Sequence, residues 1–481
     1  MASYVAAGLV VVLVGCVHTP SVNGVSGTSP APSAPWTPPQ APARAPLPVA
    51  PPPALPADIA KRVQHLTLAD VLDVALRNNP TTRISWENAR AAAAAYGSQR
   101  GAYYPTIDAD VNATRLKTVA TQGRQAVEQT TYGPSATLSF LLLDFGGRSG
   151  AVNGAKQALL AADWTHNATI QSVVLQVESA YFDYMATKAL AEAQRATVAE
   201  AERNYAAAQE RHRVGLATIA DELQAKTALS QAQLDLESVE GTLQTTRGAL
   251  AVSMGLPANV PYDVEAPAAE IPVANLADSV DVLIAQALSA RPDLAAAQAE
   301  FEQARQRVRE VRAARLPSLA LNGTGGRTYT SRLPNGGNNY TITLGLRIPL
   351  FAGFSRAYDQ VQAEAQAEAA KARLDALQQQ VVFQVFSSYY ALQTATRRVR
   401  TADDLLASAQ QSEQVALGRY RAGVGTVLDL LTAQAALASA RAQQVQARWV
   451  WATSLSQLAH DVGVLDTHGG NPLRLAPDST R

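Results

Sequence analysis

Four segments of the chain alternate apolar and polar residues, which is the period of a β-strand whose two faces meet different surroundings. The clearest of them, at 340–348, places five apolar residues on one face: Tyr340, Ile342, Leu344, Leu346 and Ile348. The same period predicts strands at about 105–115, 132–143, 317–327 and 339–350. A membrane β-barrel shows this alternation, with its apolar face toward lipid. A soluble, half-buried hairpin shows it too, so the pattern alone leaves both open.

Two very long segments, 147–213 and 353–421, contain no proline and predict single helices. At about 1.5 Å per residue, such a helix is on the order of 100 Å long. A return helix rich in Ala, Gln and Leu is predicted after each, at about 218–254 and 426–462. In the second long helix bulky residues recur every seven positions, and alanine follows three of them at the third position: Val385, Leu392, Val399, Leu406, then Ala395, Ala402, Ala409. This heptad pattern predicts close helix pairing, which a soluble scaffolding hairpin would share.

The two sets of elements belong to an internal duplication. Pro105 and Pro317 head corresponding strands, 212 positions apart, and the turn sequences RVGLATIADEL (213–223) and RAGVGTVLDLL (421–431) lie 208 positions apart. The chain therefore divides into four predicted parts after the signal sequence: a linker at 16–57, a first repeat at 58–265, a second repeat at 266–464 and a tail at 465–481.

Each repeat contributes one strand hairpin, so one chain has four strands. Four strands cannot close a barrel, and open edges are not tolerated in lipid, so several chains must share their strands. Two chains would give eight strands and almost no lumen, whereas three would give twelve and leave one.

The N-terminal region predicts export. Residues 1–15 contain a short apolar run typical of a signal peptide, although Met1–Tyr4 lacks the usual Lys or Arg. The run ends in Leu13-Val14-Gly15-Cys16, which resembles a bacterial lipobox, so Cys16 is the predicted lipid attachment site. A cleaved signal with an unmodified cysteine is the alternative. Thirteen of the 26 prolines lie between residues 20 and 56, which predicts an extended tether.

Composition narrows the function. The 481 residues carry a formal net charge of +0, which argues against nucleic acid as a partner, because neutralising phosphates needs an excess of basic residues. Cys16 is the one cysteine, so no disulfide can form within the chain. The six histidines are scattered, and the sequence contains no HExxH, no GxSxG and no phosphate-binding loop lysine. The sequence therefore predicts no enzyme, no cofactor and no metal site.

Taken together, the duplicated halves, strand hairpins, paired long helices and lipobox resemble the outer-membrane efflux protein family, the TolC-like exit ducts, in its lipoprotein branch. The resemblance covers residues 66–463. It implies a mainly α fold with a membrane β-barrel portion, in which a homotrimer forms a 12-stranded β-barrel continued by a 12-helix α-barrel. It also implies a periplasmic adaptor and an inner-membrane pump as partners, and an outer-membrane location with a long periplasmic extension.

The two repeated turns are the candidate functional site. A glycine allows each reversal, a threonine is a good N-cap of the returning helix, and an aspartate three residues later can complete a capping box. These residues are Gly215, Thr218 and Asp221 in the first turn and Gly423, Thr426 and Asp429 in the second. Capping alone explains the Thr-x-x-Asp pattern.

The resemblance adds functional roles to the same turns. It implies that Asp429 lines a constriction around the threefold axis, with Thr432 at the position of a second family aspartate, so that the ring is less acidic here. It also implies that Tyr420 and Arg421 link neighbouring helices in the closed state, although Tyr420 can simply pack and Arg421 can simply cap its helix. The adaptor-contacting tips would contain Val214, Gly215, Leu216, Thr218, Asp221, Glu222, Gly423, Val424, Gly425 and Thr426.

The resemblance, together with the lipobox, therefore implies a passive channel that carries drugs or other small molecules outward from a proton-driven pump. A protein-secretion duct that works with an ATP-driven exporter is the alternative within the same family. A periplasmic coiled-coil scaffold without a pore is the alternative from a different class of protein.

Overall fold

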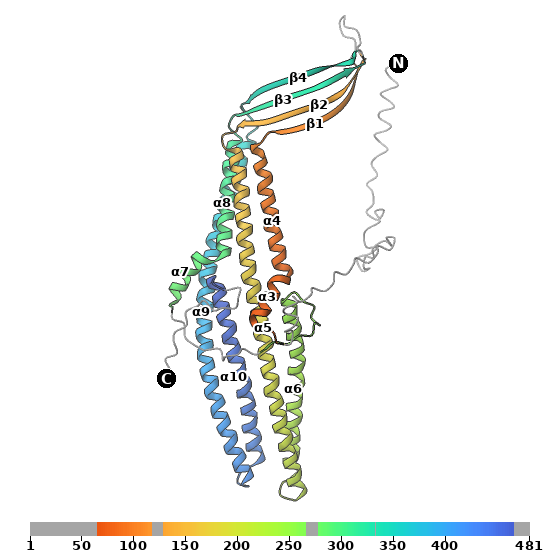
Figure 1. The fold of residues 1–481 in the computed structure, drawn as a ribbon. Helices are drawn as coiled ribbons and strands as arrows, with labels where there is room; N and C mark the ends of the chain where they lie inside the picture. The colour runs from red at the N-terminus through yellow and green to blue at the C-terminus, as the bar shows by residue number, and fades with distance from the viewer. Residues whose placement is uncertain (1–64, 118–127, 266–277, 332, 466–481) are drawn as a thin grey trace, which may run out of the picture. The chain divides into compact units, whose positions relative to one another are not determined.

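The computed structural model describes residues 65–117, 128–265, 278–331 and 333–465, all within the unit Leu55–Arg481. The predicted signal peptide, Cys16, the linker and residues 466–481 lie outside the described residues. The order of elements repeats along the chain (Figure 1). The helices are α3 (Leu68–Asn78), α4 (Pro80–Arg100), the 3-10 turn η2 (Gly101–Tyr103), α5 (Gly147–Arg213), α6 (Ile219–Ser253), α7 (Val280–Ala290), α8 (Pro292–Ala313), α9 (Ser355–Arg421) and α10 (Val427–Val462).

Four antiparallel strands form one sheet in the order β1 (Thr106–Lys117), β2 (Glu128–Leu143), β3 (Ser318–Thr330) and β4 (Leu333–Arg347). Each repeat supplies one hairpin, and the β2–β3 pair joins the two repeats. The apolar face of β4 is open, because Tyr340, Ile342, Leu344 and Leu346 are 62–83% exposed. Within the described residues, β1 and β4 each have a strand neighbour on one side only. The sheet therefore has two open edges and a bare apolar surface.

The strands β2 and β4 begin earlier than their alternation suggests, at Glu128 and Leu333 rather than near 132 and 339, and β4 ends at Arg347, before Ile348. The glycine-rich segments at 323–326 and 336–337, whose composition is typical of turns, lie inside β3 and β4. Cross-strand pairing accounts for this difference, because Gly337 pairs with Thr328 and Gly323 with Ile342. Ladder hydrogen bonds hold residues that a local reading assigns to a turn.

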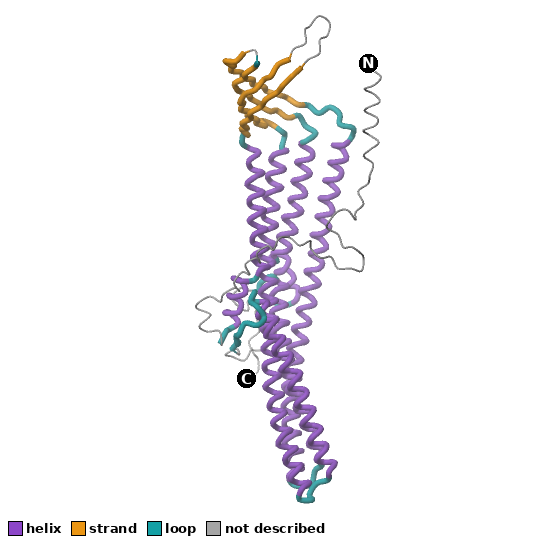
Figure 2. Tube along the Cα trace, turned by 90° about the vertical axis from the view of Figure 1, so that its right-hand side faces the viewer, coloured by secondary structure: helices purple, strands orange, loops and turns teal. Residues whose placement is uncertain are grey.

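The long helices form two hairpins, α5 with α6 and α9 with α10, and α5 also lies beside α10 (Figures 1 and 2). Both α5 and α9 have 67 residues. Nearer the sheet, α4 and α8 take the place of the return helices against α5 and α9. The predicted heptad seam is confirmed by burial of Val385, Leu392, Val399, Ala395, Ala402 and Ala409, while Leu406 is half-buried.

The main hydrophobic core lies where α3, α7 and the segment around Asp263 pack against the long helices. Trp451 is fully buried there, and its indole Nε1 donates a hydrogen bond of 3.0 Å to Thr396 Oγ1. The Asp263 carboxylate accepts hydrogen bonds of 2.9 Å from Tyr184 Oη and Lys188 Nζ, which fastens this segment to α5. These contacts join α10 to α9 and the Asp263 segment to α5.

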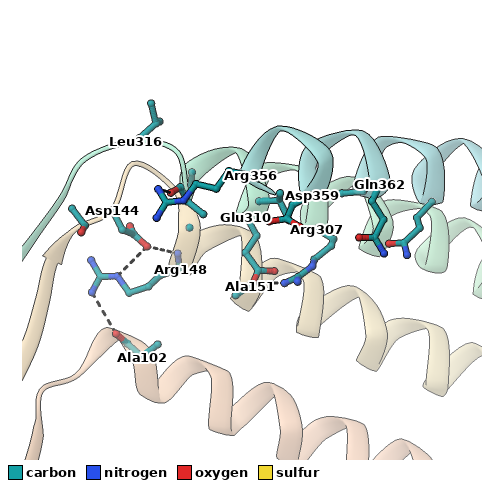
Figure 3. Close-up of a pocket in the computed structure, with 17 residues that line it drawn as sticks. Ala102, Asp144, Arg148, Ala151, Arg307, Glu310, Leu316, Arg356, Asp359 and Gln362 are labelled. Atoms are coloured by element: carbon teal, nitrogen blue, oxygen red, sulfur yellow. Dashed lines mark hydrogen bonds and ion pairs between the residues drawn. The ribbon is translucent and has the colours of Figure 1, made fainter. Parts of the chain in front are cut away.

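A charged joint connects the sheet to the helices (Figure 3). Arg148, in the first turn of α5, donates hydrogen bonds to the carbonyls of Leu142 at 3.1 Å and Ala102 at 3.4 Å, and its Nε lies 3.8 Å from Asp144. Arg148 and Arg356 line the same pocket. On its other side, Arg356 Nη1 donates to the carbonyl of Ala314 at 2.6 Å. Arginine side chains at both strand-to-helix transitions thus bind backbone carbonyls of β2, of η2 and of the C-terminal end of α8.

None of the helices within the described ranges is long and apolar enough to cross a bilayer.

Candidate functional site

The two hairpin turns lie at the end of the helices remote from the sheet (Figures 1 and 2). Gly215 and Gly423 have φ values of +76° and +75°, so both adopt the left-handed conformation that glycine tolerates best. In each turn two amides donate to one carbonyl of the preceding helix: those of Leu216 and Ala217 to Arg211, at 2.8 and 3.2 Å, and those of Val424 and Gly425 to Arg419, at 3.0 and 3.2 Å. The two turns therefore share one backbone design, as the repeated sequence predicts.

Both predicted capping boxes are confirmed. The Thr218 amide donates to Asp221 Oδ2 at 2.8 Å, and the Asp221 amide donates to Thr218 Oγ1 at 3.3 Å. In the second turn the Thr426 amide donates to Asp429 Oδ2 at 3.1 Å, and the reciprocal bond is also 3.1 Å. These hydrogen bonds satisfy backbone donors at the start of α6 and α10 that the helices leave free.

Asp429 keeps its charge in this setting. The hydrogen bond from the Thr426 side chain, then the one from its backbone, holds the pKa of the Asp429 carboxyl below its usual value. Asp429 and Thr432 are both exposed and are three residues apart on α10, so they share one face of the helix. The chain thus presents one permanent negative charge and a neutral hydroxyl on this face.

One contact near the tip joins the two hairpins directly. The guanidinium of Arg211, on α5, lies 4.5 Å from the ring centroid of Tyr420, on α9, and its Nη1 donates to the Tyr420 carbonyl at 3.3 Å. Tyr420 is half-buried under this guanidinium. A cation above an aromatic ring is attracted to the ring's negative face. The structure thereby gives Tyr420 a partner on the other hairpin.

Further from the tip, polar side chains of α5 and α10 form the seam between the two hairpins. Asn204 Nδ2 donates to Gln434 Oε1 at 2.7 Å, and Arg441 Nη2 pairs with Glu200 Oε1 at 3.2 Å. Near the hydrophobic core the corresponding contact is aromatic, with the Phe182 and Trp449 rings 6.0 Å apart. The seam between the hairpins is therefore apolar near the core and polar toward the tip. Polar contacts can exchange with water, so the tip end is the easier one to separate.

Glu222, one of the residues expected at the adaptor-contacting tips, is paired within its own turn. Its Oε2 lies 2.6 Å from His212 Nδ1, and its side chain is 18% exposed. The histidine sits in the last turn of α5 and the glutamate in the first turn of α6. This contact directs the Glu222 charge toward the hairpin interior.

The other predicted tip residues lie on the outside of the turns. Leu216 and Val424 are 72% and 69% exposed, and Val214 is also exposed. A Cβ on Gly425 would lie 3.0 Å from the Arg419 Cβ, so the second turn is more tightly closed there than the first, which has Ala217. Arg421 is exposed and makes no hydrogen bond or ion pair with the residues that the structure describes.

Two residues with contacts at this site, Arg211 and His212, are absent from the sequence-based candidates. The repeat itself contains a signal for them, because Arg211 and His212 stand 208 positions before Arg419 and Tyr420. The signal identifies equivalent positions, but not that Arg211 reaches across to the other hairpin while Arg419 stays exposed. Over the described ranges, no group of His, Cys, Asp and Glu side chains is arranged to hold a metal ion.

Comparison with known proteins agrees with this architecture. The model of the outer membrane efflux protein family matches residues 71–256 and 283–464, one match in each repeat. Protein CyaE of Bordetella pertussis is 28% identical over 389 residues, which are 80% of this chain and 81% of CyaE. The probable efflux pump outer membrane protein TtgC of Pseudomonas putida is 26% identical over 413 residues, 84% of this chain and 83% of TtgC. The solved structure of outer membrane protein VceC of Vibrio cholerae has a TM-score of 0.74 at 19% identity, over 82% of this chain and 96% of VceC.

The likeness to VceC shows the fold, and the two family matches cover the long helices, the hairpin turns and the strands of both repeats. The resemblance to this family that the sequence suggests is thereby confirmed, and its lipoprotein branch stays a prediction. This chain belongs to the outer membrane efflux protein family.

Proposed function

We propose that three copies of this chain form one passive exit duct, the outer-membrane component of a tripartite efflux system. Twelve strands, four from each copy, would close a barrel in the outer membrane, and the long helices would continue it as a tunnel in the periplasm. An inner-membrane pump, reached through a periplasmic adaptor, would supply both substrate and energy. Drugs or other small molecules would leave through the duct.

The observation that carries this proposal is the incomplete sheet. Its apolar face is bare, and its edge strands β1 and β4 have backbone groups that the described part of the chain leaves unpaired. In lipid each unpaired backbone group costs several kcal/mol, so an open sheet is not stable there. Further copies of the chain can satisfy both edges by pairing β4 of one copy with β1 of the next. A soluble scaffold gives no reason for the four strands.

Two features support the direction and class of transport. TtgC is described as a component of an efflux pump, which favours small-molecule efflux over protein secretion. The exposed apolar residues Leu216 and Val424 stand at the turns remote from the sheet, where an adaptor that approaches from the periplasm would meet them first. We therefore assign the adaptor contact to these turns.

Channel formation is tested by reconstituting the purified protein in planar bilayers. We expect the conductance to rise in equal steps, one for each trimer that inserts, because each trimer has one ionic pathway. A protein that stays in the aqueous phase without detergent, or that gives no conductance at any voltage, would contradict the duct.

The lipid anchor is tested at Cys16. We expect the Cys16→Ser variant to lose incorporation of labelled palmitate while still folding, because the acyl chain attaches to the cysteine rather than to the folded unit. Metabolic labelling followed by immunoprecipitation measures this. Equal labelling of Cys16→Ser and the unchanged protein would refute acylation at this residue.

The constriction is tested at Asp429. Three copies would place three carboxylates around one axis, and such a ring attracts cations and repels anions. We expect Asp429→Asn to lower the cation-to-anion permeability ratio by about threefold to tenfold, measured from reversal potentials in a salt gradient.

Thr426→Ala is the matched control for Asp429→Asn, because it removes the hydrogen bond from the Asp429 amide to Thr426 Oγ1 and so weakens the same helix cap, while it keeps the charge. If Thr426→Ala lowers the permeability ratio as much as Asp429→Asn does, Asp429 acts through the helix cap and the ring proposal fails.

A further inference from the structure

A groove of about 720 Å³ lies between the two hairpins, at the height of the hydrophobic core. All four long helices contribute to it: α5 through Asp183, α6 through Thr246, α9 through Ala391 and α10 through Trp449. Its volume lies within the range of small-molecule sites, which is about 300–1,000 Å³. Aliphatic side chains such as Leu190 and Val445 complete the wall.

The groove opens on the side of the helices away from the core. Leu190 lines the groove and is two residues from Lys188, which contacts the core segment at Asp263; two residues correspond to about 200° around a helix. On α10, Trp449 lines the groove and also packs against the edge of the core, in which Trp451, two residues later, is fully buried. The Leu190 side of α5 therefore faces away from the side that contacts the core segment.

The chemistry of the groove is selective. Asp183 is the one titratable residue that lines it, since α6, α9 and α10 contribute none. The Asp183 carboxylate makes no hydrogen bond or ion pair with the described residues, and partial burial raises its pKa. Trp449 adds a half-buried indole to the same wall. A carboxylate without a partner, next to an aromatic ring and aliphatic side chains, matches a flat organic cation in both charge and polarity.

We propose that this groove is a binding subsite for aromatic organic cations on the inner wall of the tunnel. The proposal rests on the proposed function, because the groove faces a lumen only if the trimer closes with α3 and α7 on its outer surface. Asp183 would hold the positive charge, and Trp449 with Leu190 and Val445 would cover the aromatic rings. The subsite would favour passage of cationic over anionic cargo at a level of the tunnel far from Asp429.

Ethidium, a flat monocation, is the probe, and fluorescein is the anionic comparison. In fluorescence titrations of the detergent-solubilised protein, we expect Asp183→Asn to weaken ethidium binding about tenfold, because the substitution removes the one charge in the groove at nearly constant volume. Asp163→Asn is the matched control: it removes an exposed carboxylate of the same helix that lies outside the groove and should change the Kd less than about twofold.

A second readout depends on pH. Cation binding needs the ionised carboxylate, so lowering the pH through the raised pKa of Asp183 should weaken ethidium binding, and Asp183→Asn should abolish this dependence. Ethidium should also quench tryptophan emission less in Trp449→Phe than in the unchanged protein. Equal effects of Asp183→Asn and Asp163→Asn, or binding of fluorescein as tight as that of ethidium, would overturn the subsite.

Conductance of the same preparations separates this failure from failure of the duct. If Asp183→Asn conducts and binds ethidium as the unchanged protein does, the subsite is wrong and the duct stands. If the unchanged protein does not conduct, the duct itself is wrong.

Discussion

Replacing Arg211 with alanine is expected to raise the ratio of open to closed tips by about a hundredfold. Arg211 on α5 touches the ring and the carbonyl of Tyr420 on α9, so any movement that separates the two hairpins must break this contact. A cation over an aromatic ring together with one hydrogen bond contributes about 1 kcal/mol at a half-exposed site. Three copies acting together give about 3 kcal/mol, and each 1.4 kcal/mol is a factor of ten.

Single-channel recording measures this ratio as open probability. Arg419→Ala is the matched control, because Arg419 is the repeat counterpart of Arg211 and is exposed at the second turn. We expect Arg419→Ala to leave the open probability near that of the unchanged protein, and Arg211→Lys to fall between the two, since lysine keeps the charge but loses the planar stacking group. An unchanged open probability in Arg211→Ala would show that this contact does not hold the tip.

The second large effect is expected at Gly133, where the two repeats meet. The β2–β3 register passes from the pair Tyr132–Tyr329 to the pair Ser135–Gly326, with the strands pressed together between them. A Cβ on Gly133 would lie 1.9 Å from the carbonyl oxygen of Arg327, and one on Gly326 would lie 2.6 Å from that of Pro134. The backbone itself would have to move, so the cost exceeds the roughly 1–3 kcal/mol of ordinary overpacking.

We therefore expect Gly133→Ala to abolish most of the heat-resistant oligomer on semi-native gels, because the sheet would open between its two halves. Gly323→Ala and Gly345→Ala are matched controls within β3 and β4, since a Cβ at either position has no atom within 4 Å. Gly133→Ala oligomers as heat-resistant as those of the controls would contradict the close approach of β2 and β3.

Much of the fold follows from local sequence signals. A two-residue period indicates the strands, Pro80 and Pro292 begin new helices, and Thr-x-x-Asp indicates where α6 and α10 start. Each of these signals acts within a few residues of the chain, where propensity and capping decide the structure. The duplication strengthens the prediction of each element, because the same sequence signal occurs in both repeats.

The features that the sequence does not indicate all depend on contacts between two or more elements. The start of β4 at Leu333 is held by pairing with Thr330 across the hairpin, against a local composition of Pro, Asn and Gly that is typical of turns. Glu222 is directed inward by His212, ten residues earlier and on the opposite helix. The Asp183 groove needs four helices to be placed together, so periodicity within one helix cannot indicate it.

In the proposed duct, one chain has too few strands to close a barrel, and three copies share their strands. Native mass spectrometry of the protein extracted from outer membranes in detergent measures how many copies assemble. We expect a dominant species of three times the mass of the mature chain. A monomer, or a dimer with only eight strands, as the stable conducting form would contradict it.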